Sequence, residues 1–325
     1  MPAAGWVVLG HPEITPPSNF YQLPDTTAST ALVATAGIAA AEVKISGYAE
    51  IGVIGGDIYE TDQWHTDIDV TFSMTGESDG GLAFGASVDL DENGAFGNTT
   101  QGGETYFLSY GALRLDMGDT DGAFDAAMRE VNLAGASIAD DETEHAGFNG
   151  NSGLDGTFDG QIARVSYSAA GFTAGLSAEI DDSGDADPVW GLGLRYTTDL
   201  GGAAVGIGLG YQTQEDIGDL VGLSLDATMA NGFSAAINYS ELDPEVGDDN
   251  VTHLGLGVGY TMNALSVGVN YGVNEVDGDE VSSGFGLAAT YDLGGGLAAH
   301  LGYGNSDVDG ADDSDRYSLG LSMSF

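Results

Sequence analysis

The sequence predicts an all-β protein, a 16-stranded antiparallel transmembrane β-barrel. Three observations carry this prediction. Residues alternate between apolar and polar along the chain, the connections between the alternating segments are short and long in turn, and aromatic residues stand at the segment ends. A soluble β-sandwich would instead spread its aromatic residues through one closely packed core.

Apolar residues recur at every second position from Glu42 to the C-terminus, which is the period of a strand and not of a helix. In the last segment Leu319, Leu321, Met323 and Phe325 alternate with serine and glycine. Sixteen such segments are expected, beginning near Val43, Trp64, Leu82, Thr105, Ala112, Ile162, Phe172, Val189, Ala203, Leu220, Phe233, Val251, Leu265, Val281, Leu297 and Arg316.

The connections between these segments alternate in length. Seven short turns are expected at 76–81, 110–111, 169–171, 198–202, 229–232, 261–263 and 292–295. Eight long connections are expected near 55–63, 91–104, 118–160, 181–188, 212–219, 240–250, 272–280 and 304–315. A 16-stranded barrel with both termini on one side needs these numbers, and outer-membrane barrels have short periplasmic turns and long outer loops.

Aromatic residues stand at both ends of the predicted strands, on the apolar face. One end has Tyr110, Tyr167, Phe172, Tyr196, Phe233, Tyr260, Tyr291 and Phe325, and the other has Tyr211, Tyr239, Tyr271 and Tyr303. Such rings form girdles at the two interfaces of a membrane. The opposite face carries glycine, serine and charged residues. Because charges need water, this face is expected to line an aqueous lumen.

The composition excludes several other classes of protein. The chain has 51 Asp and Glu against 6 Lys and Arg, and a formal net charge of −45 repels the phosphates of a nucleic acid. The absence of cysteine excludes disulfide scaffolds, thiolate zinc sites and cysteine nucleophiles. After the N-terminal segment there is no run of about 18 apolar residues that would predict a transmembrane helix. Most acidic residues fall in the long connections, so we expect a strongly anionic outer mouth.

Residues 1–41 are expected to be a leader, and residues 42–325 the barrel. The run from Ala31 to Ile38 is apolar and is followed by an A-x-A pattern, which predicts signal-peptidase cleavage after Ala41. A signal peptide also has a basic start, whereas the first basic residue here is Lys44. The alternative is therefore an N-terminal tail on a soluble protein.

Several short motifs resemble those of a known family. The segment 42–47 (EVKISG) after A-x-A, the segment 115–119 (LDMGD), the segment 291–296 (YDLGGG) and the terminal Phe325 are similar to alphaproteobacterial general porins. This resemblance spans the chain from Glu42 onward. It implies a homotrimeric outer-membrane channel that passes small hydrophilic solutes and ions passively. The partners of such a channel are the membrane lipid and lipopolysaccharide around it. The resemblance also implies a third loop folded into the lumen, and a Phe325 that the barrel-assembly machinery reads.

The third loop, about 118–160, is expected to form the constriction of the pore. Its acidic candidates are Asp119, Asp121, Asp125, Glu130, Asp140, Asp141, Glu142 and Glu144, and a short helical turn is expected near Phe124–Arg129. Strand parity directs five of the six basic residues into the lumen: Lys44, Arg114, Arg164, Arg195 and Arg316. The resemblance implies that these wall residues face the loop carboxylates across the constriction. The alternative is that each neutralises an acidic residue on a neighbouring strand. With the acidic mouth and loop, we expect cation selectivity.

Clustered carboxylates are candidate Ca²⁺ ligands in the outer loops. The segment that begins at Asp89 matches the first half of an EF-hand loop, but its twelfth position is Thr100 and no helix flanks it. A looser site is a better match for the many oxygen ligands of Ca²⁺. Its candidate ligands are Asp89, Asp91, Asp307 and Asp309. The alternative is a solvated anionic surface.

No catalytic motif is found, so we expect neither an enzyme nor a required cofactor. The glycine runs at 206–210 and 255–259 lie inside strands, and we expect them to leave space in the lumen. Four histidines follow the leader, His65, His145, His253 and His300, of which His253 and His300 face the lumen by parity. Two alternatives stay open: a solute-specific channel of the same fold, and a non-transporting adhesive barrel that binds calcium through its acidic loops. A pore folds the third loop inside, whereas an adhesin projects it outward.

Overall fold

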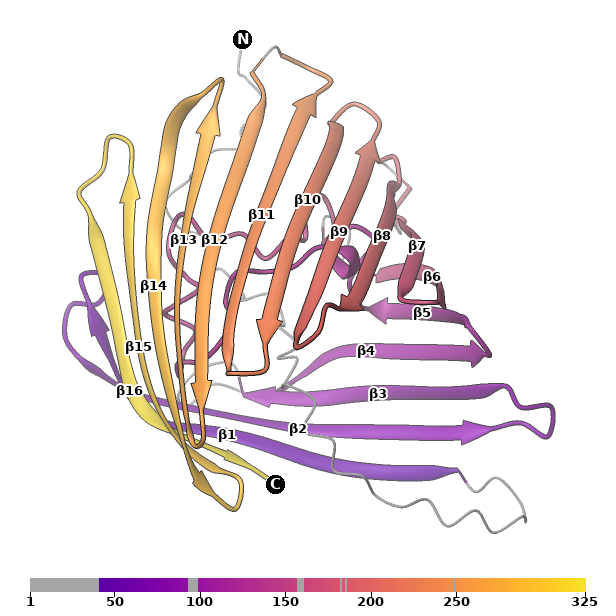
Figure 1. Ribbon diagram of the computed structural model, residues 1–325, viewed down its shortest axis with the longest axis horizontal. Coiled ribbons are helices and arrows are strands. Elements are labelled where there is room, and N and C mark those ends of the chain that lie inside the picture. The colour runs from indigo at the N-terminus through magenta and orange to yellow at the C-terminus, as the bar shows by residue number, and fades with distance from the viewer. Residues whose placement is uncertain (1–40, 93–98, 157–160, 182, 185, 248) are drawn as a thin grey trace.

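The computed structural model describes residues 41–92, 99–156, 161–181, 183–184, 186–247 and 249–325. The strands are β1 (Glu42–Gly56), β2 (Gln63–Glu77), β3 (Ala83–Glu92), β4 (Thr99–Tyr110), β5 (Leu113–Asp119), β6 (Gln161–Ala169), β7 (Phe172–Glu179), β8 (Val189–Asp199), β9 (Ala203–Gln214), β10 (Gly218–Met229), β11 (Phe233–Pro244), β12 (Val251–Met262), β13 (Leu265–Val276), β14 (Asp279–Gly294), β15 (Leu297–Val308) and β16 (Ser314–Ser324). Each strand pairs with its sequence neighbours, and β1 pairs with β16 to close the barrel (Figure 1). The predicted fold is confirmed.

Of the predicted leader, all but Ala41 lies outside the described residues, so its boundary stays a prediction.

The predicted strand starts agree with the structure to within about two residues except in β4, which begins at Thr99 and not near Thr105. Two of the expected long connections are tight turns, at 215–217 and 277–278. There the ladder continues through polar residues, because Glu275 pairs with Glu280 and Val276 with Asp279. Acidic sequence therefore does not by itself mark a loop, since a paired strand tolerates acidic residues once it extends beyond the membrane.

The strand register places the apolar residues on the outside of the barrel. Leu209 and Val258, in the middle of β9 and β12, are both 48% exposed. Phe325, at the edge of the barrel that carries the short turns, is 80% exposed, and its backbone N–H donates to the Gly47 carbonyl at 2.9 Å where β1 meets β16. No helix among the described residues is long and apolar enough to cross a membrane. In the closed barrel, neighbouring strands satisfy the backbone polar groups, as a lipid environment requires.

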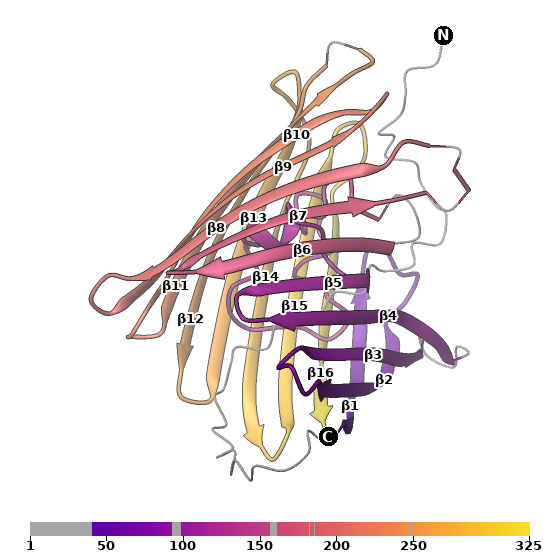
Figure 2. The same ribbon diagram turned by 90° about the vertical axis from the view of Figure 1, so that its right-hand side faces the viewer.

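Loop 3, residues 120–160, runs across the interior of the barrel (Figure 1 and Figure 2), and its described part ends at Gly156. It contains one turn of 3₁₀-helix, Asp125–Ala127, within the segment expected to be helical. The inward fold of the third loop is thus observed, and it is the arrangement expected of a pore and not of an adhesin.

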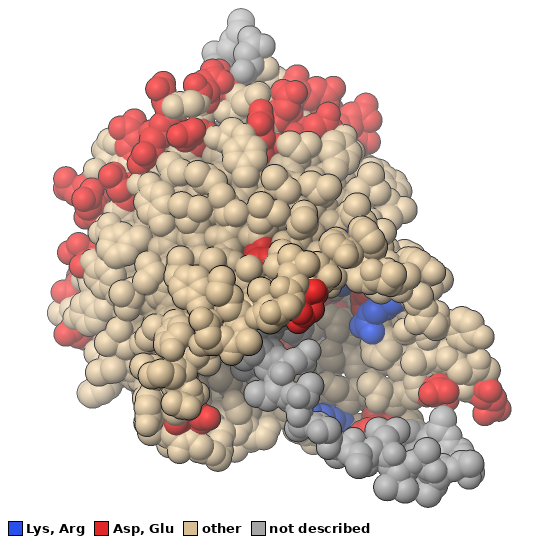
Figure 3. All heavy atoms as spheres, viewed as in Figure 1, with Lys and Arg blue, Asp and Glu red and all other residues tan. Residues whose placement is uncertain are grey.

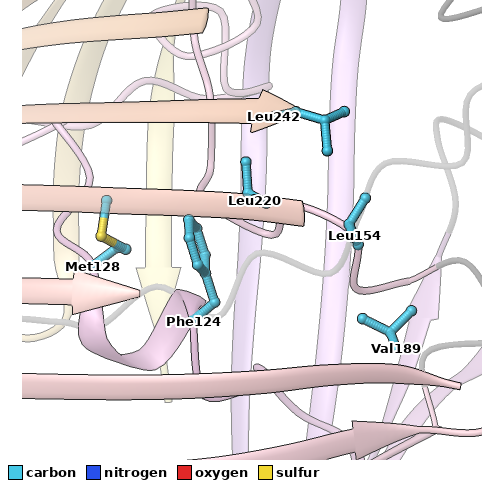
Figure 4. Packing of buried hydrophobic residues seen from close by; sticks show 6 residues of the cluster. All are labelled: Phe124, Met128, Leu154, Val189, Leu220 and Leu242. Carbon is cyan, nitrogen blue, oxygen red and sulfur yellow. The ribbon is translucent and has the colours of Figure 1, made fainter. Parts of the chain in front are cut away.

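An apolar cluster fixes one end of loop 3 to the wall. Figure 4 shows Phe124 and Met128 beside the short helix and Leu154 near the end of the loop, close to apolar residues of the strands. The cluster consists of Phe124, Met128, Leu154, Val189, Leu220 and Leu242. The last three lie on the otherwise polar inner face. Burying a side chain of this size is worth roughly 1.5–3 kcal/mol, so the cluster gives the loop a stable attachment inside the lumen.

Candidate pore and constriction

The inner wall has two parts that differ in their side chains. On β7–β10, β12–β16 and β1, inward-facing glycines lie against loop 3, and β11 contributes the buried Ala236. We call β7–β16 with β1 the covered wall. On β2–β6, which we call the open wall, charged and hydroxyl side chains point inward. These include Asp67, Asp69, Ser73, Ser87, Asp89, Thr105, Arg114, Asp116 and Arg164. Among the described residues, loop 3 touches the open wall only at its β6 edge, through Arg164, and leaves the rest of it facing the free part of the lumen.

Hydrogen bonds join loop 3 to the covered wall along its length. The Ser177 hydroxyl accepts from the Ala123 N–H at 2.8 Å, and the Asn270 amide donates to the Glu142 carbonyl at 3.1 Å. Further bonds join Asn238 to the Arg129 carbonyl, Thr290 to the Ala136 N–H, Asn274 to the Ala146 carbonyl, and Gln212 to the Leu154 N–H. These bonds satisfy backbone groups that a buried loop would otherwise leave unpaired.

The histidines predicted to face the lumen lie in this contact. His300 Nδ1 is 2.7 Å from the Ala136 carbonyl oxygen of loop 3. His253 Nδ1 is 2.9 Å from Asn274 Oδ1, and Asn274 in turn holds the loop. From the loop side, His145 Nε2 lies 2.6 Å from Asn270 Oδ1. The three rings therefore help to fix the loop.

Three of the five lumen arginines and lysines reach loop 3. Arg316 forms an ion pair with the loop carboxylate Glu144. Arg164 donates to the Asp121 carbonyl at 2.9 Å. Arg195 lies 3.4 Å from the Ala127 carbonyl and forms an ion pair with Asp226 of β10.

The remaining two lie on the wall away from the loop. The Arg114 guanidinium lies 4.3 Å above the Phe107 ring and pairs with Asp116 at 2.7 Å. Asp116 also lies 3.5 Å from Arg164. Lys44 is exposed on β1, opposite Ser73 of β2. Arg316 therefore faces a loop carboxylate, whereas Arg114 pairs with an acidic residue of its own strand, β5, and Arg195 of β8 pairs with one on β10.

Two of the loop carboxylates do not face the free lumen. Asp141 and Glu142 are only 3% and 5% exposed and turn toward the covered wall. Ser318 donates to Asp141 at 2.7 Å, and Ser137 donates to Glu142. The backbone turns tightly here, with the N–H of Thr143 and of Glu144 bonded to the Asp140 carbonyl. This differs from the expected pore-lining position. Glu144 and Asp121 are exposed, and Asp119, Asp125, Glu130 and Asp140 are half-buried.

Burial also changes the charge that loop 3 carries. Burial, and then the neighbouring Asp140 carboxylate, raise the pKa of Glu142 to about 8. Burial raises the pKa of Asp140 to about 7, with Glu144 adding to the effect. The pKa of Asp125 is raised well above its ordinary value by burial and by the charge of Asp121. Near neutral pH the loop therefore carries fewer negative charges than its sequence suggests.

A strip of carboxylates on the open wall is the feature that the sequence analysis missed. Asp67, Asp69 and Asp91 have carboxylate oxygens within 4.8 Å of one another, and Asp89 pairs with Thr71 beside them. The alternation of β2, with Ile68 and the apolar residues after it outward, is a signal that directs Asp67 and Asp69 into the lumen. From the sequence, only Asp89 and Asp91 were candidates, and only as calcium ligands.

The two candidate calcium clusters have different outcomes. Asp89 and Asp91 lie on β3 and face the lumen, so the first four residues of the EF-hand-like segment belong to a strand. Within the described ranges, Asp67, Asp69 and Asp91 are the only group of three or more acidic or histidine side chains close enough to share an ion. Asp307 and Asp309 belong to no such group there. Calcium binding itself stays a prediction.

Charge is also separated on the scale of the whole molecule. In the face shown in Figure 3, acidic side chains gather along the outer edge, whereas basic side chains appear within the hollow of the barrel. A closed 16-stranded barrel with an apolar exterior, a charged open wall and a loop across its lumen defines the class of outer-membrane diffusion channels.

Comparisons with known proteins place the chain in a family. The family model of Gram-negative porins matches residues 28–311, so the chain belongs to the Gram-negative porin family. It is an outer-membrane general diffusion porin of the kind that the sequence resembled. A porin of Rhodobacter capsulatus is 29% identical over 297 residues, which cover 83% of this chain and 96% of that protein. A porin of Fuscovulum blasticum is 24% identical over 254 residues, or 72% and 84% of the two chains.

Solved structures show the same architecture. A porin structure refined at 1.8 Å matches with a TM-score of 0.68 and 25% identity, covering 87% of this chain and all of the other (100%). A triple mutant of the Rhodopseudomonas blastica porin matches with a TM-score of 0.64 and 18% identity, with the same coverage of 87% and 100%. The second likeness is one of fold alone.

Proposed function

We propose that this porin is cation-selective and that its solute path runs between loop 3 and the open wall. The carboxylate strip of Asp67, Asp69 and Asp91 is the observation that carries the proposal, because it faces the part of the lumen that loop 3 leaves free. Arg114 and Arg164 oppose it, but they share Asp116 and so contribute about one net positive charge.

The effect of each charge on a permeating ion depends on its distance from the ion. A carboxylate about 6 Å from a permeating ion contributes roughly 0.7 kcal/mol even at the dielectric constant of water. Charges farther away than about 10 Å are largely screened in 0.1 M salt. The strip acts on ions within the pore itself, whereas the acidic outer loops act mainly at the mouth.

The zero-current potential of a bilayer under a KCl gradient tests this proposal. The purified porin should give the sign expected for K⁺ permeation at near-neutral pH. A potential of the opposite sign, which indicates Cl⁻ preference, would contradict it.

We further propose that the porin is a homotrimer whose subunits meet along β1, β2 and β16. The family resemblance supports the trimer. The side chains of Val43, Ile45, Trp64 and Leu319 support the location: they are 67%, 63%, 80% and 62% exposed, well above the outward residues of β9 to β15.

The trimer should run as an oligomer on a gel without heating and as a monomer after boiling. Ile45→Lys should abolish the oligomer band, because a charge would then be buried between subunits. The matched control is Val267→Lys, which places the same charge on the outer face near the periplasmic start of β13. Equal gel behaviour of the two variants would contradict the proposed interface.

A further inference from the structure

We propose that six inward-facing glycines of the covered wall position loop 3 and thereby set the bore of the pore. This glycine track consists of Gly193, Gly208, Gly257, Gly268, Gly272 and Gly286. The inference deepens the proposed function and rests on the solute path between loop 3 and the open wall.

At each of these glycines, a backbone oxygen of loop 3 occupies the place of the missing side chain. A Cβ at Gly193, Gly208 or Gly257 would overlap the carbonyl oxygen of Ala123, Ala127 or Val131, respectively. A Cβ at Gly268, Gly272 or Gly286 would overlap that of Ala134, Gly147 or Glu142. The loop therefore lies as close to the wall as a backbone can lie, in the geometry of Cα–H···O contacts.

Backbone conformation does not explain these glycines. None of the six has the positive φ that favours glycine, whereas turn residues such as Gly171 and Gly232 do. Glycine inside a strand costs stability and marks places where another backbone approaches closely. Close approach of loop 3 is the explanation that remains. The space that these glycines leave in the lumen is therefore filled by the backbone of loop 3.

The glycine track follows the loop and not the barrel as a whole. Its contacts pass from β8 and β9 to β12, β13 and β14, and Gly302 and Gly320 extend the close contact to Asp141 and Ile138. The open wall, which the described part of the loop touches only at β6, carries side chains at most of the corresponding inward positions. A methyl group on the track would move the loop by roughly one bond length, about 1.5 Å. The loop can move only away from the covered wall, so the free lumen must narrow.

Gly208→Ala and Gly206→Ala form a matched pair for the test. Both residues face inward on β9, two positions apart. The methyl at Gly208 meets the Ala127 carbonyl oxygen of loop 3, whereas that at Gly206 meets only the ends of the Arg195 and Asp226 side chains. The measurement is the largest neutral polyethylene glycol that enters the open channel, recorded as its effect on single-channel conductance.

Gly208→Ala should shift this cut-off to smaller polymers and lower the conductance in plain salt, and Gly257→Ala should do the same. Gly206→Ala displaces no loop backbone atom and affects at most the 3.4 Å contact of Arg195 with the Ala127 carbonyl, so it should shift the cut-off much less. A purely structural role would lower heat stability without moving the cut-off, and an unchanged cut-off in both track variants would overturn the inference. Neutral polymers do not sense charge. The polymer cut-off can therefore stay unchanged in the track variants while the zero-current potential of the wild type still shows cation preference. Equally, the cut-off can shift while the potential shows anion preference, so the two proposals fail separately.

If the track variants fail to assemble, the same substitutions in a barrel that lacks residues 123–155 provide the decisive comparison. Assembly should return there, because the loop is the group that the methyl displaces. Continued failure without the loop would overturn the inference.

Discussion

Replacing Asp67, Asp69 and Asp91 together by asparagine is expected to remove most of the cation preference of this porin. Crowded carboxylates share protons, so the strip carries about two charges at neutral pH. Two charges at about 6 Å stabilise a cation by roughly 1.4 kcal/mol and destabilise an anion by a similar amount. Even after screening by salt, the permeability ratio of K⁺ to Cl⁻ should fall on the order of tenfold. The measurement is the zero-current potential under a KCl gradient.

The control removes the same number of carboxylates elsewhere. Asp307, Asp309 and Asp312 lie at the outer end of β15 and in the connection that follows it, and their replacement by asparagine should change the zero-current potential little. Arg114→Gln with Arg164→Gln should increase cation preference. If the outer-loop variant lost as much selectivity as the strip variant, the mouth and not the strip would set the preference.

Raising the pH from about 4.5 to about 8 is expected to loosen loop 3, and Glu142→Gln is expected to remove much of this effect. Glu142 has an ordinary pKa of 4.5 and a pKa of about 8 in the docked loop. Glu142 therefore holds its proton more tightly when loop 3 is docked on the wall than when the loop is released. Docking is strongest below the ordinary pKa of Glu142 and weakens as the pH rises to about 8.

The readout is the fluctuation of the open-channel current as a function of pH. In the wild type it should increase as the pH rises from about 4.5 to about 8 and level off above that. In Glu142→Gln the rise should be clearly smaller, because the amide keeps an acceptor for Ser137 and cannot ionise, and only the neighbouring Asp140 still titrates in this range. Glu144→Gln, two residues away on the exposed side, should retain the rise. A wild type that is equally steady at all these pH values would contradict the role of Glu142.

The barrel was predictable because its strands repeat one physical constraint. Lipid on one side and water on the other impose a period of two, and this pattern located strands such as β9 and β12 at their observed starts. The same parity placed Arg164, Arg195 and His300 correctly on the inner face. It failed at 277–278, where the membrane no longer acts and polar residues remain in a paired strand.

The site was less predictable because loop 3 has no period. The Asp141 side chain could point into the lumen or toward Ser318 of the wall. Which of the two it does depends on contacts with strands more than a hundred positions away in sequence. Val189, Leu220 and Leu242 are apolar on the polar face, and only the docked loop explains them. One signal was nonetheless present: inward glycines gather on β7–β16, and inward charges gather on β2–β6.

The path between loop 3 and the open wall is tested most directly by thiol accessibility, since the natural chain has no cysteine. Ser87 is half-buried on the open wall, whereas Ser224 is fully buried (0% exposed) on β10 beneath loop 3. A charged thiol reagent added to an open channel should promptly change the single-channel current of Ser87→Cys and leave that of Ser224→Cys unchanged. Modification of Ser224→Cys with no effect at Ser87→Cys would show that ions pass on the other side of the loop.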